Sequence, residues 1–148
     1  MNACDAVLEA LAEQLACYRR LAKLVQIQHE HVRQSRTEQL LEVLKSRQEL
    51  LERMAACEAV VAPVKRRWPQ YLAELDGAKR QQAEGLLAET RMLLEQITTA
   101  DRDDALVLQQ RKLNLGRQIN QAASARQINR TYGVAAYGRR PSRMDLQR

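Results

Sequence analysis

The fold class is decided by residues 4–32, whose sequence is CDAVLEALAEQLACYRRLAKLVQIQHEHV. Mostly apolar side chains recur there at alternating steps of four and three residues, at Cys4, Leu8, Leu11, Leu15, Tyr18, Ala22, Val25, His29 and Val32. Such spacing, kept over about four heptads, places an apolar stripe on one side of an amphipathic helix that packs as in a coiled coil. We therefore predict a long helix over about residues 3–33.

The composition favours helices throughout the chain. Of 148 residues, 45% are hydrophobic and 28% are charged, as is typical of one soluble folded domain. Phe is absent, aromatic residues make up 3%, and Gly and Pro number only five and three. Strands, tight turns and Gly-rich nucleotide-binding loops need those residue types. The sequence therefore excludes a β-sandwich, a Rossmann fold and a barrel.

A second helix is predicted over residues 36–62. Its stripe consists of Leu40, Val43, Arg47, Leu50, Met54, Cys57, Val61 and Val64. Arg47 is the one charged residue in this stripe. Ser35, followed three residues later by Glu38, matches a capping box that would start the helix, and Pro63 would end or kink it. The short connection between the first two helices favours an antiparallel hairpin.

A third helix is predicted over residues 78–129, after a connector at 63–77 that holds a short helical turn. Its stripe runs through Ala83, Leu86, Thr90, Leu93 and Ile97 and resumes at Leu108, Lys112, Leu115, Ile119 and Ala122. The step of 11 residues keeps both parts on one face of a nearly straight helix. We favour one continuous helix over a break at 98–101, where Thr and Asp could cap a new start. The predicted fold class is all-α, a long antiparallel hairpin plus a long third helix in a three-helix, coiled-coil-like bundle.

The last residues differ from the rest in charge and pattern. A helical domain at 1–129 is predicted to precede a flexible tail at 130–148, which holds two Gly, one Pro and no apolar periodicity. Residues 126–148 contain six arginines and one acidic residue, Asp145, so the remainder of the chain is nearly neutral. Tyr132, Tyr137 and these arginines could contact bases and phosphates. We do not expect a nucleic-acid partner, because the body offers no basic face.

No catalytic, metal or cofactor site is predicted. The histidines of His29-Glu30-His31 are two residues apart, so on a helix they point away from each other. No Ser or Cys nucleophile lies beside a His base, because both histidines share this stretch. The acidic stretch at 101–104 is interpreted as charged surface. The chain is therefore not expected to be an enzyme or to bind a small-molecule substrate or cofactor.

Exposed apolar residues predict a protein partner. A hairpin of about 30 residues covers only part of the third helix, so the later part of that helix should stand at least half uncovered. The predicted client-binding residues are Leu108, Leu115, Ile119 and Ile128. An amphipathic helix of another protein, or a second copy of this chain, would cover them.

The layout resembles the FlgN-type flagellar export chaperones. The resemblance covers most of residues 1–133 and rests on the break at 33–38, on residues 39–54 (QLLEVLKSRQELLERM) and on a long final helix rich in Leu, Gln, Asn and Arg. It also rests on the exit of that helix into Thr131-Tyr132-Gly133, which is similar to the Tyr-Gly element of the family. The arginines at 139–143 have no counterpart in the family pattern.

The resemblance implies a non-catalytic chaperone of type III flagellar export. Its clients would be hook-associated (hook-filament junction) proteins, whose C-terminal amphipathic helices it would hold unassembled until export. Tyr132 would dock at the cytoplasmic domain of the membrane protein of the export gate, with Tyr137 as a weaker substitute. The first alternative is a structural, self-associating coiled-coil protein, and the next is a nucleic-acid binder that uses the basic tail.

The expected location is the cytoplasm. No apolar stretch is long enough to span a membrane, and residues 1–5 lack the basic and apolar parts of a signal peptide. The three cysteines, Cys4, Cys17 and Cys57, are odd in number and form no CxxC pair, which is typical of reduced thiols.

Overall fold

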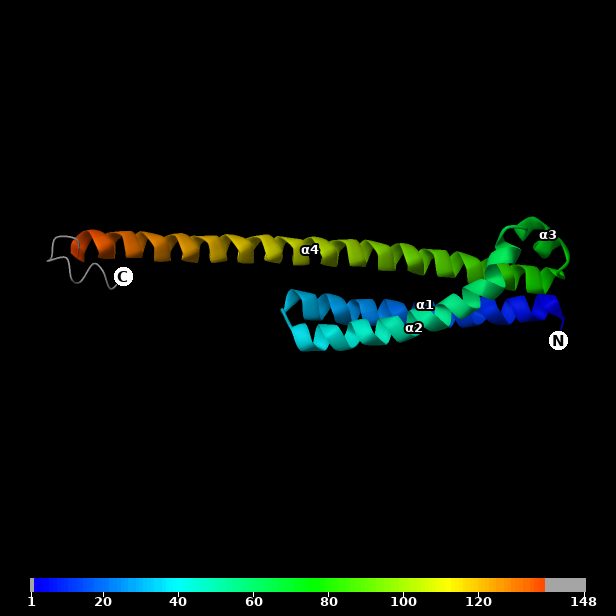
Figure 1. Cartoon of the computed structure of the whole chain (residues 1–148). Helices are drawn as coiled ribbons and strands as arrows, with labels where there is room; N and C mark the ends of the chain where they lie inside the picture. Colours follow the sequence, from blue (N-terminus) through cyan, green and yellow to red (C-terminus); the bar gives the residue numbers. More distant parts are fainter. Residues whose placement is uncertain (1, 138–148) are drawn as a thin grey trace. The chain divides into compact units, whose positions relative to one another are not determined.

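The structure is a computed structural model that describes residues 2–137, with side chains placed for residues 2–133. These residues form four helices, α1 (Ala3–Arg33), α2 (Thr37–Lys65), α3 (Trp68–Ala73) and α4 (Gly77–Tyr137) (Figure 1). No strand occurs between residues 2 and 137, so the predicted all-α class is confirmed. None of the helices in that range is both long enough and apolar enough to cross a membrane.

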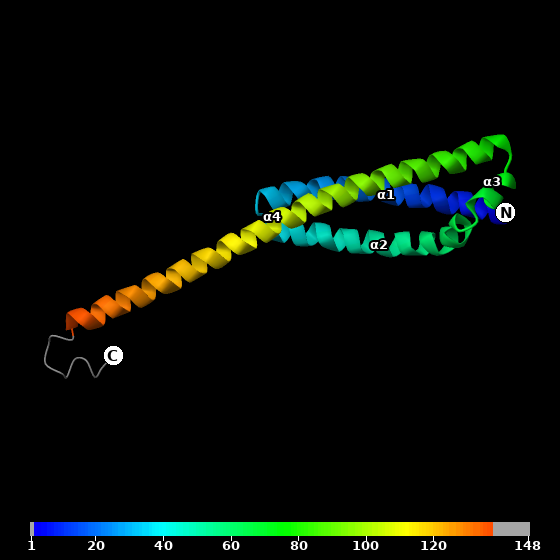
Figure 2. The same cartoon turned by 90° about the horizontal axis from the view of Figure 1, so that it is seen from above.

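Contacts between residues divide the chain into two units, Met1–Val107 and Leu108–Arg148. In the first unit, α1 and α2 run antiparallel, and the part of α4 up to Val107 lies along this hairpin (Figures 1 and 2). The division falls earlier than the predicted boundary at 129. The reason is burial, because no side chain among residues 108–133 is buried.

Two clusters of buried side chains form the core of the first unit. One lies at the end that holds α3 and consists of Val7, Leu8, Leu11, Val61, Tyr71, Leu75 and Ala83. The other lies further along the hairpin and consists of Cys17, Leu21, Val25, Leu50, Met54 and Ile97. Each cluster contains residues of α1, α2 and α4. Because α1 packs against two helices, it buries a wider face than its predicted stripe, which would suffice for a single neighbouring helix. Each fully buried aliphatic side chain contributes roughly 1.5 to 3 kcal/mol to folding.

The turn between α1 and α2 is closed by backbone hydrogen bonds. The amide of Arg36 donates to the carbonyl of His31 at 2.9 Å, and the amide of Ser35 donates to the carbonyl of Val32 at 3.3 Å. This is a Schellman motif, and it places Ser35 at a φ of 56°. The predicted capping box is wrong, because Arg36 is the N-cap of α2 and its side chain makes no capping bond. The left-handed backbone at Ser35 assigns this residue to the end of α1.

The connector between α2 and α4 is more helical than predicted. α2 continues through Pro63 to Lys65, so the predicted end at residue 62 is wrong. Pro63 is exposed, and the backbone carbonyl that it leaves without an N–H partner can be hydrated. The Tyr71 hydroxyl of α3 donates to the Cys4 carbonyl at 3.3 Å, which fixes α3 against the start of α1. Asp76 then caps α4 by accepting the Lys79 amide at 2.8 Å.

α4 is one continuous helix, as predicted. The alternative break at 98–101 is absent, because the Thr98 hydroxyl donates back to the Leu94 carbonyl at 2.8 Å and does not cap a new helix. α4 also extends past the predicted end at residue 129, to Tyr137. Its last turns contain Ala at 135 and 136 and no Pro, so one Gly at 133 costs only about 1 kcal/mol and does not break the helix. The predicted flexible tail therefore begins inside a helix, and residues 138–148 lie outside the described part.

Candidate functional site: an apolar face of α4

The predicted client-binding residues all lie on the second-unit part of α4 with exposed side chains. Leu108, Leu115, Ile119 and Ile128 are between 43% and 59% exposed. Aliphatic side chains of this size would each be stabilised by burial against an apolar partner. Their number in one short segment makes α4 the candidate interaction surface.

Helix geometry divides the predicted set in two. Leu108, Leu115 and Ile119 are separated by seven and four residues, so they share one side of α4, which we call the Leu115 face. Ile128 follows Ile119 by nine residues, or about half a turn in angle at 3.6 residues per turn. Ile128 therefore lies on the opposite side and is not part of the Leu115 face.

The opposite side of α4 carries its own apolar residues. Ile128 lines a shallow hollow with Ser124, Gln127, Thr131 and Tyr132. Leu113, which the sequence prediction omitted, is also exposed and lies about half a turn from Leu115 in angle. Its position two residues before Leu115 could have shown that it lies on another side of the helix, because residues i and i+2 do not share a face.

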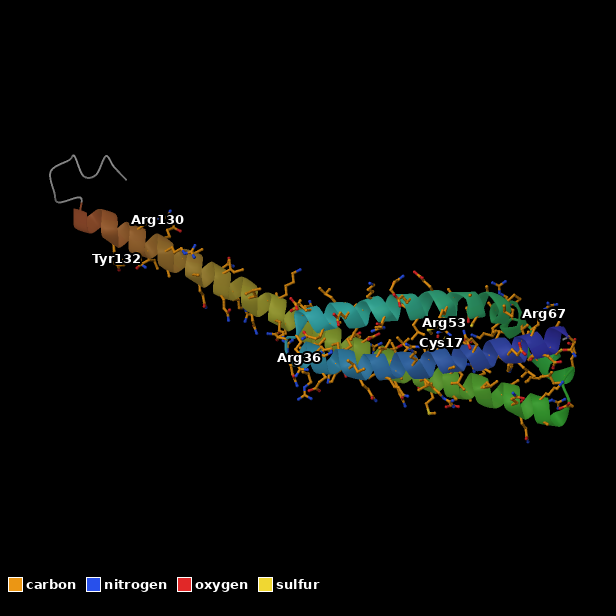
Figure 3. All side chains as sticks on the ribbon, turned by 90° about the horizontal axis from the view of Figure 1, so that it is seen from below. Cys17, Arg36, Arg53, Arg67, Arg130 and Tyr132 are labelled. Atoms are coloured by element: carbon orange, nitrogen blue, oxygen red, sulfur yellow. The ribbon has the colours of Figure 1, made fainter. Side chains whose placement is uncertain are left out.

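Tyr132 is the most accessible of the large exposed side chains, at 71% (Figure 3). It extends from α4 one helical turn after Ile128 and makes no hydrogen bond through its hydroxyl within the described residues. Tyr137 is the last residue of α4, and its side chain lies outside those described. The two predicted docking tyrosines therefore belong to the helix itself and not to a tail.

The α4 segment at 105–137 is strongly basic, a feature that the analysis of net charge missed. It contains no Asp or Glu and five basic residues, Arg111, Lys112, Arg117, Arg126 and Arg130. Lys112 follows Leu108 by four residues, and Arg126 follows Ile119 by seven, so both positive charges lie along the Leu115 face. The net charge of the chain before the tail is near zero, because acidic residues in α1, α2 and the early part of α4 balance the basic residues of this segment. The net charge therefore gave no sign of it.

A polar network lies at the other end of the hairpin, inside the first unit. Asp104 of α4 is 2% exposed and accepts from Gln28 at 3.0 Å, and its other oxygen lies 2.6 Å from Nδ1 of His29. Arg47 of α2 donates two hydrogen bonds of 2.8 Å to the carboxylate of Asp101. The interpretation of 101–104 as plain surface is wrong for both aspartates. Arg47 lies in the predicted stripe of α2 and Asp104 is buried, and both are tolerated because each is paired.

The His and Asp side chains of this network do not form a metal-ligand set. Among the residues whose side chains are described, no three His, Cys, Asp or Glu side chains converge as metal ligands would. The carboxylate of Asp104 already has protein donors, so the network joins three helices and presents no open coordination position. Its role in the first unit is to fix the register of α4 against the hairpin.

Two further features of the first unit bear on ligand binding. A pocket of about 230 Å³ lies between α1 and α3, lined by Cys4, Arg67, Tyr71, Glu74 and their neighbours, and it is smaller than the ~300 Å³ at which small-molecule sites begin. Burial raises the pKa of the Cys17 thiol. This effect outweighs the opposite effect of the nearby Arg53 guanidinium on α2, which lowers the pKa (Figure 3). A thiol with a raised pKa is a poor nucleophile at neutral pH.

Comparisons with known proteins identify no relative. No protein-family model matches the chain, and neither the curated proteins nor the solved structures contain a significant match. The resemblance to FlgN-type chaperones therefore stays a prediction from the sequence.

Proposed function

We propose that this chain is a cytoplasmic chaperone of type III flagellar export that binds the C-terminal amphipathic helix of a hook-associated protein on the Leu115 face of α4. The observation that carries the proposal is the alignment of three exposed aliphatic residues on one side of a helix. An amphipathic client helix would replace water over these residues by its own apolar stripe. Each residue that becomes fully buried would contribute roughly 1.5 to 3 kcal/mol before the cost of ordering the client.

The charge of α4 adds a requirement on the client. Five basic residues and no acid at 105–137 favour a client helix whose stripe is flanked by Asp or Glu. The same charges disfavour the alternative in which two copies of α4 pair through their Leu115 faces, since each copy would bring the positive charges of Lys112 and Arg126 to the contact. An acidic client therefore fits this segment better than a second α4.

Tyr132 is proposed as the docking residue for the export gate. Its side chain is exposed and lies about a third of a turn from the Leu115 face in angle, so a client on that face need not cover it. An exposed tyrosine offers both an apolar ring and a hydroxyl to a partner surface.

Titration calorimetry with the full chain tests the main proposal. The ligands are C-terminal fragments of the two hook-filament junction proteins from the same genome. We expect saturable binding to at least one fragment at about micromolar affinity or tighter, a negative heat-capacity change, and weakening at higher salt. Absence of heat and of co-elution with both fragments would overturn the proposal.

A duplex DNA fragment of random sequence is the comparison ligand. Because 105–137 is basic, some weak and strongly salt-dependent retention of DNA is expected from charge alone. Tighter binding to DNA than to either fragment at physiological salt would favour the nucleic-acid alternative instead.

A further inference from the structure

α2 carries a second apolar stripe that no part of the first unit covers. Leu41, Leu44 and Leu51 are 41% to 61% exposed, whereas the core residues of α2 point to α1 and α4. With the exposed residues Gln48 and Ala55, these leucines recur at steps of three and four and form one continuous line, which we call the α2 stripe. It extends over about 14 residues, or roughly 21 Å of helix at about 1.5 Å per residue.

Two opposite charges accompany the α2 stripe on one flank. Lys45 directly follows Leu44, and Glu52 directly follows Leu51, so both lie on the same side of the stripe seven residues apart. Both are exposed, and neither makes an ion pair with any described residue. The stripe is therefore self-complementary in sequence, with an aliphatic and a charge at each end and Gln48 near its centre.

We propose that the α2 stripe is a homodimer interface in which α2 of one copy pairs antiparallel with α2 of a second copy, about a two-fold axis near Gln48. In this arrangement Leu44 of one copy lies beside Leu51 of the other, and Lys45 of one copy lies beside Glu52 of the other. Leu41 of one copy lies beside Ala55 of the other. Each contact occurs twice, as a two-fold interface requires.

The charges select the antiparallel direction. In a parallel pair the two-fold axis runs along the helices, so the flank with Lys45 and Glu52 in one copy lies on the side of the interface opposite to that flank of the other copy, and these charges do not meet. An antiparallel pair instead brings each Lys45 to the opposite charge. Gln48 lies at the axis, where its side-chain amide can both donate to and accept from the side-chain amide of Gln48 in the second copy.

This interface shares no residue with the client-binding surface. The α2 stripe belongs to the first unit, while the Leu115 face lies on α4 beyond Val107. The dimer therefore does not depend on the proposed chaperone function, and either proposal can fail without the other.

Sedimentation equilibrium of the full chain and three charge variants tests the dimer. We expect a dimer that dissociates in the micromolar range for the parent chain. Lys45→Glu and Glu52→Lys each put like charges together and should weaken dimerisation by about tenfold or more. The double variant with both reversals should restore most of the parent affinity, because the pair is opposite in sign again. Glu42→Lys, an exposed charge reversal that lies further from the α2 stripe in angle, is the matched control and should leave the dimer intact.

Cross-linking with a short bis-maleimide gives an independent test. Gln48→Cys places a thiol near the two-fold axis, so it should produce far more covalent dimer than the parent chain. Ser46→Cys, exposed on a different side of α2, should not exceed the parent. Monomers at all concentrations up to about 100 μM, or equal cross-linking of the two variants, would overturn the proposal.

A client on the α2 stripe is the competing outcome. It would be shown by a monomeric parent chain in which Leu44→Asp weakens binding of a hook-junction fragment. That result would overturn the dimer and move the client to α2.

Discussion

His29 of α1 and Asp104 of α4 form a hydrogen bond in which Nδ1 and Oδ1 are 2.6 Å apart. The carboxylate of Asp104 is 2% exposed, while the His29 side chain remains partly open to solvent. The contact ties the end of the hairpin to α4 within the first unit. A carboxylate buried to this degree is stable only while its donors are present.

Asp104→Asn should therefore lower the free energy of unfolding by about 1 to 3 kcal/mol. The amide keeps the size of the side chain but turns one acceptor toward Gln28 or His29 into a donor, so a buried group loses its partner. Urea unfolding followed by circular dichroism measures the effect. Asp103→Asn, which changes the exposed neighbour, should stay within about 0.5 kcal/mol of the parent. Equal stability of the two variants would show that the network does not contribute.

Ser35→Gly should stabilise the first unit by about 1 kcal/mol. Ser35 has a φ of 56°, a conformation that is strained for residues with a Cβ and free of that strain for glycine. The midpoint of thermal unfolding should rise. The same substitution at Ser46, in the middle of α2, should instead destabilise by roughly 0.5 to 1 kcal/mol, because glycine is a poor helix former. A loss of stability at position 35 would contradict the turn geometry.

Glu58 should make stability depend on acid pH. Burial alone would raise the pKa of this carboxyl, but hydrogen bonds from Gln14 and Lys65 lower the pKa below its ordinary value of 4.5. A depressed folded pKa contributes stability above the unfolded pKa, and that contribution is lost as the pH falls through the folded value. Glu58→Gln should therefore lose less stability than the parent on acidification from about pH 6 to pH 3.

The control for this pH effect is Glu95→Gln, which removes an exposed carboxylate that has no such hydrogen bonds. It should keep the acid dependence of the parent. An identical acid dependence of the Glu58→Gln variant and the parent would show that Glu58 does not contribute.

Leu115→Asp combined with Ile119→Asp should weaken client binding by about a hundredfold or more, because two aliphatic side chains that the bound client would cover become charged. Leu113→Asp combined with Ile128→Asp puts the same two charges on other sides of α4 and should leave affinity within about threefold. Calorimetry with the same fragment compares the two. The folded first unit should be unaffected in both, since neither pair is buried. The reverse order of affinities would place the client on the Ile128 side.

Tyr132→Ala should leave client affinity unchanged and reduce export. The side chain is exposed and lies off the Leu115 face, so its loss removes a docking group without touching the client. Secretion of the client into the medium, normalised to its amount in the cell, is the measurement. Tyr132→Phe keeps the ring and shows whether the hydroxyl matters. Normal secretion by the alanine variant would exclude the docking role.

The candidate site was only partly predictable from the sequence. The periodicity identified Leu108, Leu115 and Ile119, because steps of seven and four place residues on one side of any regular helix. Ile128 was grouped with them only because it was expected to be exposed. Its position around the helix axis, about half a turn from Ile119, places it on the opposite side of α4. The sequence also did not show which of the two stripes of α2 is buried, since leucines spaced three or four residues apart occur in both.

The sequence by itself determined the class of fold and the long helices, because helix propensity and apolar spacing act over neighbouring residues. Tertiary structure decided which polar residues are buried. Asp104 and Arg47 enter the interior only because Gln28, His29 and Asp101 come to meet them from other helices. The left-handed Ser35 likewise depends on how α1 ends against α2. A chain encodes such pairings between residues that are distant in sequence, and no local pattern reveals them before the helices pack.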